Sequence, residues 1–544
     1  MSARRAVLNL PTLAFLAILA VLIGLRIAVL RASPLDLHFD EAQYWTWSRT
    51  LEWGYFSKPP LVAWAIAAST ALFGDAEWAV RLAAPVAHGL GAIALFALGR
   101  GIYGAWAGFW AGTGWLLLPA VSLSSGIIST DALMLPLWSA ALWALWRLTL
   151  TRAWFWAIVL GLVVGAGALA KYSMLYFPLC AALAAWWSMP VRAAILSRLG
   201  VIAGLVALAV LTPHLIWNAR NAFITVAHTA ANARLNQDDL INPDEVFEFV
   251  SGQAGVIGPL LLLALIWLLW RAARRTASLA DEDKFLLAFA LPPLAAILAQ
   301  AFFARANANW AAAAYPAALV WIAGSLLTSA RGRRYLAAAS LVNLALGAAI
   351  TVAAVSPAFA NRFEFIANGM KRARGWEETA REIALRAAPK PGEAPFTAVL
   401  VDHRALYFEL AYYWREQRAA GQATPTRLRR SEAPASPRRE RSFSFAQASA
   451  QLPPVRMWLL HGQARNSAEQ SDPMRLEEGA RVLVVHMTPG YVPLVADDFT
   501  AFRRVERLAI PLGGGLNREL EISVGEDFAP APRDAAFERG LRGE

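Results

Sequence analysis

Long apolar runs separated by short polar loops dominate the first two-thirds of the chain. The first run, from about residue 10 to 30, follows Arg4 and Arg5. It is longer than the apolar region of a signal peptide, so it predicts a transmembrane helix with a cytoplasmic N-terminus. Further runs that span, or nearly span, a bilayer lie near residues 79–98, 105–122, 131–147, 154–170, 172–189, 199–216, 253–270, 285–303, 309–328 and 335–355. The pattern predicts about eleven transmembrane helices.

Basic residues in the short loops set the expected orientation. With eleven spans, the cations that fall together on the cytoplasmic side are Arg100, Arg147, Arg152, Arg192, Arg198, the RAARR run ending at Arg275, and Arg331 to Arg334. Residues 61–73 are apolar but too short to span, so we expect a re-entrant or interfacial helix in the first outer loop. The same topology puts residues 36–58, Asp131, Lys171, the polar loop at 217–250 and residues 305–310 on the outer side.

The pattern changes after Pro357, where charges become frequent. The segments FTAVLV, VRMWLL and RVLVVH predict short buried strands, and residues 376–387 and 405–415 predict helices. Arg, Ser and Pro fill residues 427–442, which predicts a loosely held loop. We therefore expect a transmembrane domain at 1–356, with its first outer loop at 31–78, and an α/β domain on the outer side at 357–544.

Composition supports a polytopic α-helical membrane protein, since 57% of the 544 residues are hydrophobic and 16% are charged. The single cysteine, Cys180, lies in an apolar run, which excludes an intramolecular disulfide and argues against redox chemistry as the main activity. The net charge of +11 comes mostly from arginines, many of them in short loops, which indicates topology and contact with anionic lipid rather than nucleic-acid binding.

Candidate chemistry is concentrated in residues 36–64, DLHFDEAQYWTWSRTLEWGYFSKPPLVAW. Asp40 and Glu41 are adjacent, so on a helix their side chains point about 100° apart and cannot both face one target. We expect one carboxylate to act and the other to hold structure. Tyr44 follows Asp40 by one helical turn, which would place the phenol beside the carboxylate. Charged and aromatic residues beside a membrane helix also serve as plain interfacial anchors, which is the alternative interpretation.

A second group in the same loop contains Tyr55 and Lys58, three residues apart. Pro59 and Pro60 prevent a helix directly before them, so the lysine is expected at a fixed corner. A carboxylate and a cation between aromatics suit group transfer from a lipid phosphate. Lys58 can neutralise the leaving phosphate, and Asp40 can accept the proton of the attacking hydroxyl. One base with direct displacement at the anomeric carbon predicts inversion.

Other candidates have competing structural interpretations. Asp131 follows Ser129 and Thr130, so it could position the acceptor or hold a cation, or simply belong to a helix N-cap. Lys171 could bind phosphate or extend from a helix end to the headgroups, and Arg81 has the same two interpretations. Weaker candidates for a phosphate clamp are His214, Asn218, Arg220 and Arg234. His38, Asp40 and Asp131 offer oxygen and nitrogen ligands, but their spacing matches no metal signature, so no metal site is predicted and a divalent cation is left open as a cofactor.

The motifs FDEAQYWTWSRTLEWGYFSKPPLVAW, STDALMLPLW, ALAKYS and NANWAAAAYP resemble the bacterial GT-C glycosyltransferases related to protein O-mannosyltransferases and to the lipid A aminoarabinose and galacturonic acid transferases. The likeness covers roughly residues 36–355. It implies a polyprenyl-phosphate-linked sugar donor, an inverting mechanism, and a multi-pass inner-membrane enzyme whose active site and C-terminal domain are periplasmic.

The resemblance also implies roles for individual residues. It makes Asp40 the catalytic carboxylate and Asp131 the second-loop carboxylate. It assigns donor-phosphate binding to Tyr55 and Lys58 and matches the tyrosine after the Asp-Glu pair to Tyr44. Apart from the resemblance, Arg81 and Lys171 are further candidates for donor-phosphate binding, and Glu41 and Asn309 for structural or acceptor-binding roles. Aminoarabinose transferases often have Glu before the lysine, whereas Ser57 stands here, which argues against an associated metal site and against that sugar. A lysine followed directly by two prolines and an aromatic-rich first loop fit the uronic-acid branch about as well.

Together these features predict an inverting glycosyltransferase that moves a sugar from a polyprenyl phosphate to lipid A, lipopolysaccharide or another envelope glycolipid. Its other partners would be membrane lipids, and no nucleic acid. The alternatives are a protein O-glycosyltransferase with the same donor class, a transporter or flippase, and a non-enzymatic scaffold. Transporters more often carry ionisable residues near mid-membrane in repeated halves, and the sequence shows no obvious repeat and few such charges.

Overall fold

The computed structural model describes residues 9–232, 242–274, 279–415, 452–461, 464–471, 479–530, 532–534 and 537. The chain forms two compact units, one comprising Met1–Pro34 and Trp47–Phe359, the other comprising Leu35–Thr46 and Ala360–Glu544. By their contacts, residues 35–46 group with the second unit. The division into domains 1–356 and 357–544 stays a prediction. The expected loop at 427–442, Arg234 and Arg275 lie outside the described residues.

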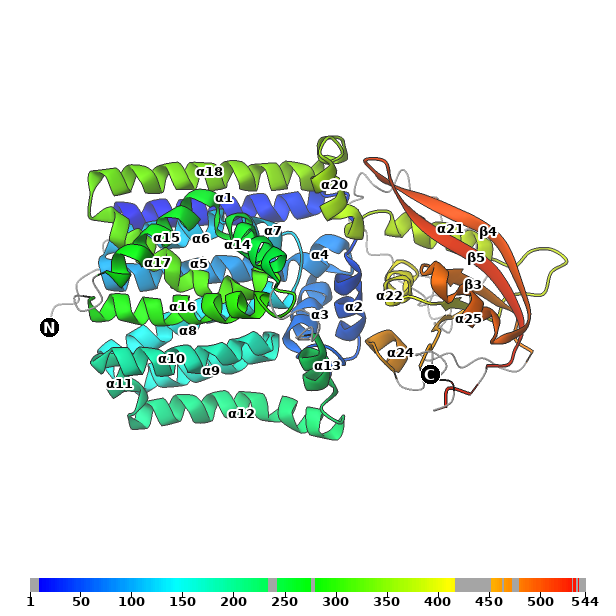
Figure 1. Ribbon diagram of the computed structural model, residues 1–544, viewed down its shortest axis with the longest axis horizontal. Coiled ribbons are helices and arrows are strands. Elements are labelled where there is room, and N and C mark those ends of the chain that lie inside the picture. The colour runs from blue at the N-terminus through cyan, green and yellow to red at the C-terminus, as the bar shows by residue number, and fades with distance from the viewer. Residues whose placement is uncertain are drawn as a thin grey trace. The chain divides into compact units, whose positions relative to one another are not determined.

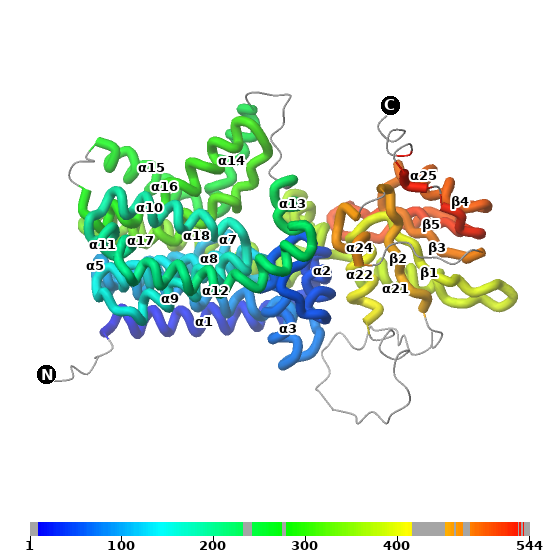
Figure 2. Tube along the Cα trace, turned by 90° about the horizontal axis from the view of Figure 1, so that it is seen from below, coloured from blue at the N-terminus to red at the C-terminus, as the bar shows by residue number. Residues whose placement is uncertain are grey.

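The first unit is a helical bundle (Figure 1). Its helices are α1 (Leu10–Ala32), α3 (Leu61–Phe73), α4 (Glu77–Arg81), α5 (Ala83–Tyr103), α6 (Ala105–Leu117), α7 (Pro119–Ser124), α8 (Thr130–Thr151), α9 (Trp154–Ala170), η1 (Tyr172–Leu175), α10 (Tyr176–Trp187), α11 (Met189–Ile195), α12 (Arg198–Arg220), α13 (Ile224–Asn232), α14 (Pro243–Ile257), α15 (Pro259–Ala273), α16 (Asp281–Ala301), η3 (Ala308–Ala314), α17 (Tyr315–Leu327) and α18 (Ala330–Val355). Two further helices, α2 (Phe39–Ser48) and α19 (Pro357–Ala360), run across the division between the units. The long helices lie roughly parallel to one another in both views (Figures 1 and 2).

The membrane-spanning character of this bundle follows from helix length and apolarity. Among the described residues, seven helices are long and apolar enough to cross a membrane, or eight if α14 and α15, which are bent by 113°, form one span. All eleven expected runs are helical, but α6, α9 and α10 have only 13, 17 and 12 residues. The polytopic α-helical fold is therefore confirmed, whereas the number of eleven spans stays a prediction.

Glycines allow the helices of the bundle to approach closely. A Cβ atom at Gly108 of α6 would lie 2.4 Å from the carbonyl oxygen of Phe96 on α5, and one at Gly161 of α9 would lie 2.5 Å from that of Ala203 on α12. Small residues at such crossings bring backbones into van der Waals contact, which is a main source of helix association where both helix and lipid are apolar.

The second unit contains a mixed sheet covered by helices. Its elements are α20 (Glu364–Met370), η4 (Lys371–Ala373), α21 (Trp376–Ala387), β1 (Ala398–Val401), α22 (Arg404–Tyr413), β2 (Val455–Met457), α24 (Ser467–Ser471), β3 (Val482–His486), η7 (Pro489–Tyr491), α25 (Val492–Ala496), β4 (Phe499–Gly513) and β5 (Leu516–Phe528). In the described residues the strand order is β2-β1-β3-β5-β4. β1 is parallel to β2 and β3, and β5 is antiparallel to β3 and β4.

Most of these elements match the sequence pattern. The three short strands predicted from apolar runs are β1, β2 and β3, and α21 has the predicted bounds. The β4–β5 hairpin was not predicted. Its turn contains Gly513, Gly514 and Gly515, all at positive φ, a conformation that glycine adopts without strain.

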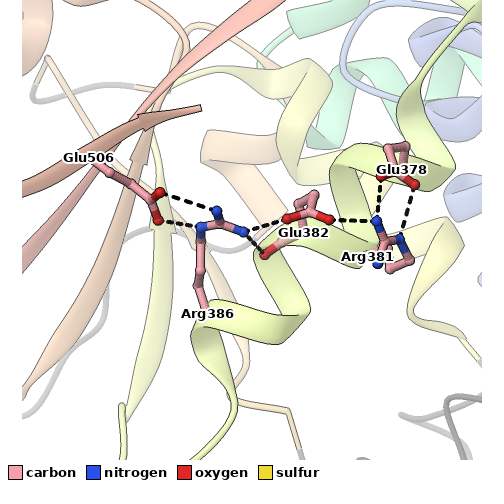
Figure 3. A network of polar contacts seen from close by, with 5 residues as sticks. All are labelled: Glu378, Arg381, Glu382, Arg386 and Glu506. Carbon is pink, nitrogen blue, oxygen red and sulfur yellow. Dashed lines mark hydrogen bonds and ion pairs between the residues drawn. The ribbon is translucent and has the colours of Figure 1, made fainter. Parts of the chain in front are cut away.

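A charged network ties α21 to β4 (Figure 3). Arg386 on α21 donates from Nε to Glu506 Oε1 on β4 at 2.5 Å and from Nη1 to Glu382 Oε2 at 2.7 Å. Arg381 joins Glu382 to Glu378, with both Nη2 distances at 2.5 Å. Because these side chains are partly exposed, each pair adds little to stability, and the network mainly fixes the helix face that meets the strand.

Candidate active site

The N-terminus of α2 separates the roles of the two adjacent carboxylates. Glu41 is fully buried and its Oε2 accepts the His38 N–H at 2.9 Å, the reciprocal contact of a helix capping box. His38 Nδ1 accepts the Asp40 N–H at 3.1 Å, and burial lowers the pKa of His38. Asp40 is outside this cap, and its side chain is 39% exposed. Its position leaves Asp40 as the carboxylate of this pair that can meet a substrate.

Asp40 has a partner that the sequence interpretation missed. Arg404, the first residue of α22, donates from Nη1 to Asp40 Oδ1 at 3.0 Å and to Gln43 Oε1 at 2.6 Å. All three residues belong to the second unit. Arg404 comes shortly after the predicted strand FTAVLV, and the carboxyl ends of strands in α/β units are where functional side chains gather. That position was the one signal in the sequence that could have drawn attention to it.

The loop after α2 is built around Tyr55. Its ring stacks on Trp47 with centroids 4.7 Å apart. Its hydroxyl donates to the carbonyl oxygens of Trp47 and Thr50, each at 3.1 Å, and accepts the Glu52 N–H at 3.2 Å. Burial raises the pKa of Tyr55. These contacts give Tyr55 a structural role in the loop, and its role in donor-phosphate binding stays a prediction.

Lys58 lies at the corner expected from the two prolines. The Tyr55 N–H donates to the Lys58 carbonyl oxygen at 3.1 Å, which closes a tight turn directly before Pro59 and Pro60. The lysine is partly exposed. α3 begins at Leu61, so the turn is fixed between the stacked tyrosine and the start of a helix.

The end of α12 clamps the same loop from the other side. A carbonyl oxygen only accepts, so His214 Nδ1 donates to Trp53 O at 2.6 Å, and Nε2 accepts from the Tyr172 hydroxyl at 2.7 Å. Trp217 donates from Nε1 to Glu52 Oε2 at 3.0 Å. His214, and Asn218 one turn later, are buried. His214 therefore contacts the loop at Trp53, whereas the Asn218 side chain bonds Tyr172 and His214, and the phosphate-clamp role of both residues stays a prediction.

A second polar group in the first unit contains Asp131, Lys171 and Asn309. Lys171 Nζ lies 2.8 and 2.9 Å from the two Asp131 oxygens, and Asn309 Nδ2 donates to Asp131 Oδ2 at 3.1 Å. Ser129, rather than Asp131, caps α8, since its side chain accepts the Ala132 N–H at 3.2 Å. Three residues predicted from separate motifs thus meet, from the start of α8, the end of α9 and η3.

The remaining predicted residues are less exposed. Tyr44 on α2 and Arg81 at the end of α4 are both buried, at 6% and 2% exposure, and their phosphate-binding roles stay predictions. In the described part of the chain, no three His, Cys, Asp or Glu side chains gather as a metal site. Apart from Arg81, the predicted residues lie in three places: on α2, in the loop with Tyr55 and Lys58, and in the Asp131, Lys171 and Asn309 cluster.

Comparison with known proteins adds sequence and fold relatives. The model of the family described as dolichyl-phosphate-mannose-protein mannosyltransferase matches residues 57–217. The chain is 34% identical over 398 residues to the lipid A galacturonosyltransferase RgtD of Rhizobium johnstonii, a match that covers 72% of this chain and 80% of RgtD. The family match includes Lys58, Asp131 and Lys171, and the segment with Asp40 lies before it.

Two crystal structures of ArnT from Cupriavidus metallidurans share the fold. The one bound to undecaprenyl phosphate has a TM-score of 0.57 at 16% identity, and the apo structure has 0.58 at 14% identity. Each comparison covers 97% of this chain and 99% of ArnT. At such identities the likeness concerns the fold, including the helical part and the C-terminal sheet.

Proposed function

Because the chain belongs to the bacterial GT-C glycosyltransferase family that includes the lipid A galacturonosyltransferase RgtD, we propose that it transfers a uronic acid sugar from a polyprenyl phosphate to lipid A or another envelope glycolipid. Identity to RgtD supports both the acceptor class and the sugar. Ser57, in the place where aminoarabinose transferases often carry Glu, argues against aminoarabinose as the sugar. The reaction would take place at the periplasmic face of the inner membrane.

The observation that carries the mechanism is the difference between Asp40 and Glu41. Glu41 is used in the helix cap, whereas Asp40 keeps an exposed oxygen. In the proposed reaction the acceptor hydroxyl attacks the anomeric carbon, its proton passes to Asp40, and the bond to the phosphate oxygen breaks. A single displacement of this kind inverts the anomeric centre, and the base contributes about 10²- to 10⁴-fold to the rate.

The leaving polyprenyl phosphate needs a positive charge rather than a proton. Lys58 supports this role, since its turn is fixed by the Tyr55 N–H and by two prolines. Asp131 binds Lys171 and also accepts a hydrogen bond from Asn309, so Asp131 acts as the carboxylate that positions Lys171 as a second cation. Fixed cations stabilise developing phosphate charge without reorganisation, which is the largest contribution that such a site offers.

The test is mass spectrometry of lipid A and core glycolipids from cells that lack the protein and are complemented with wild type, Asp40→Asn or Asp75→Asn. Asp75 is a matched control, because its side chain is 36% exposed and is paired with Arg49 at 3.1 Å. We expect the mass of one hexuronic acid residue with wild type and Asp75→Asn, and its absence with Asp40→Asn. Full modification by Asp40→Asn would remove the base assignment, and a sugar found on peptides instead would make the acceptor a protein.

A further inference from the structure

The segment that carries Asp40 is held by the C-terminal part of the chain. Asp36 Oδ2 accepts the Trp376 N–H of α21 at 2.8 Å, and the Leu37 N–H donates to the Tyr413 hydroxyl of α22 at 3.2 Å. These contacts explain why residues 35–46 group with residues 360–544. The base of the proposed reaction is therefore mounted on the α/β unit.

Arg404 is presented from a rigid part of this unit. It begins α22 directly after β1, and β1 lies between β2 and β3 in the sheet. The His403 side chain caps the helix by accepting the Ala405 N–H at 3.1 Å. Asp402 accepts the N–H groups of Met487 and Thr488, which follow β3, at 2.8 and 2.9 Å. The carboxyl ends of two neighbouring strands thus fix the start of the helix.

The guanidinium of Arg404 is fixed on three sides. It bonds Asp40 Oδ1 and Gln43 Oε1, which lie one turn apart on α2, and its Cζ lies 4.7 Å from the ring centroid of Phe39. Cation–π contact and a charge-assisted hydrogen bond together restrain both partners. Gln43 is buried, which restrains its end of the contact.

The Arg404 contact gives the two carboxylate oxygens of Asp40 different environments. Oδ1 of Asp40 is occupied by Arg404. Among the described residues Oδ2 accepts no hydrogen bond; His38 Nδ1 lies 3.9 Å from it and itself accepts the Asp40 N–H. One oxygen is anchored and the other is available.

We propose that Arg404 is a positioning residue of the transfer reaction, which holds Asp40 by Oδ1 so that Oδ2 receives the proton of the acceptor hydroxyl. The inference rests on the proposed function, in which Asp40 is the base. As the acceptor oxygen bonds to the anomeric carbon, its proton moves to Oδ2, and the polyprenyl phosphate leaves with the electron pair of the broken bond. The α/β unit then contributes to catalysis through Arg404, in addition to any role in binding the acceptor.

The test compares Arg404→Ala with Arg481→Ala in the full-length protein, with turnover and polyprenyl phosphate affinity measured for each. Arg481 is the matched control, because it pairs with Glu393 at 2.8 Å and stacks on Phe396 at 4.5 Å elsewhere in the same unit. We expect Arg404→Ala to lower kcat by about tenfold to a hundredfold, as for a displaced catalytic group, with donor affinity unchanged. Free guanidinium should restore part of the lost rate, and Arg481→Ala should match wild type.

A double variant separates positioning from an independent effect. In the Asp40→Asn background, Arg404→Ala should cause no further loss, because a residue that acts through Asp40 has nothing left to position. A wild-type kcat in Arg404→Ala would overturn the proposal, and so would an equal loss in both backgrounds or a loss that guanidinium does not restore. Full turnover by Asp40→Asn alone would instead refute the proposed function, so the two failures are distinguishable.

Discussion

Burial decides the roles of residues that are neighbours in sequence. Asp40 and Glu41 are chemically alike, and helix geometry alone predicts that they point in different directions. Their order at the start of α2 puts Glu41 three residues after His38, where it closes the cap, and leaves Asp40 partly exposed. Local spacing was sufficient to predict that the two carboxylates differ in environment, and the catalytic role of Asp40 stays a prediction.

Contacts between distant residues were beyond sequence reasoning. Arg404 and Asp40 are 364 positions apart, and no local pattern joins them. Asp131, Lys171 and Asn309 were each identified from their own motifs, but their meeting depends on how α8, α9 and η3 pack. A single sequence gives the types of candidate residues, whereas their pairing is a property of the tertiary fold.

At the residue scale, the prediction concerns Lys58. Replacing it with methionine keeps the length of the side chain and removes a charge-assisted contact to the donor phosphate. We expect a loss of donor affinity of about 1.5 to 3 kcal/mol, roughly tenfold to 150-fold in Kd. Titration of polyprenyl phosphate into the purified protein measures it.

The matched control for Lys58→Met is Lys284→Met, at the start of α16, where the lysine pairs with Asp281 at 3.5 Å. Donor affinity should equal that of wild type in this variant. If Lys58→Met and Lys284→Met bind the donor equally well, the phosphate lies elsewhere, and Lys171 becomes the first alternative.

At the scale of elements, the sequence succeeded where periodicity was strong and local. β1, β2 and β3 are short, mostly buried runs, and α21 has a clear apolar face. β5 could also have been predicted, since Leu520, Ile522 and Val524 alternate with polar residues after a three-glycine turn. β4 gave little signal because most of its side chains are exposed.

The junction of β1 and β3 contains a buried acid and a buried base with opposite proton linkage. Asp402 and His486 lie 3.8 Å apart from Oδ2 to Nδ1. Burial raises the pKa of Asp402 to about 6 and lowers the pKa of His486 to about 4. Between about pH 4 and 6 the folded chain keeps the proton on Asp402, and the unfolded chain keeps it on His486. Because the numbers of bound protons match, the pair should add almost no pH dependence to stability in this window.

Single substitutions should reveal the two opposite pH dependences of stability that cancel in the wild type. Asp402→Asn leaves His486, whose lowered pKa makes stability rise as pH increases from about 4 to 6.5. His486→Gln leaves Asp402, whose raised pKa makes stability fall as pH increases from about 4 to 6. In each variant the free energy of unfolding should change by on the order of 2 to 3 kcal/mol across its pH range. Thermal unfolding of the full-length protein in detergent measures both, and parallel pH profiles for the two variants would contradict the shifted pKa values.

At the scale of the whole chain, every apolar run that was predicted to span is helical. The number of spans was harder to predict from sequence than the helices themselves. α14 and α15 show the reason. They are separated at Gly258, whose φ is +96°, and Asn343 Nδ2 on α18 donates to the Ile257 carbonyl oxygen at 3.0 Å. A side chain from a distant helix thus satisfies the broken backbone, and hydropathy alone does not show this.

Orientation in the membrane is the prediction at this scale. Cys180 is the single cysteine of the chain and is fully buried, so Cys180→Ala provides a background without thiols. Thr50, before α3, and Thr151, at the end of α8, are both exposed and can each be replaced by cysteine. Three expected spans lie between them, so a membrane-impermeant maleimide added to spheroplasts should label residue 50, and should label residue 151 only after permeabilisation. Cys180→Ala alone should stay unlabelled.

The result also decides the role of α3, whose 13 residues are too few for an untilted span. If α3 crossed the membrane, four spans would separate the two cysteines, and both would be labelled from the outside. Every basic loop from Arg100 to Arg334 would then face outward, against the attraction of Lys and Arg for the cytoplasmic side. Labelling at residue 50 alone would place the loop with Lys58 on the outer face. It would also show that α3 does not cross the membrane.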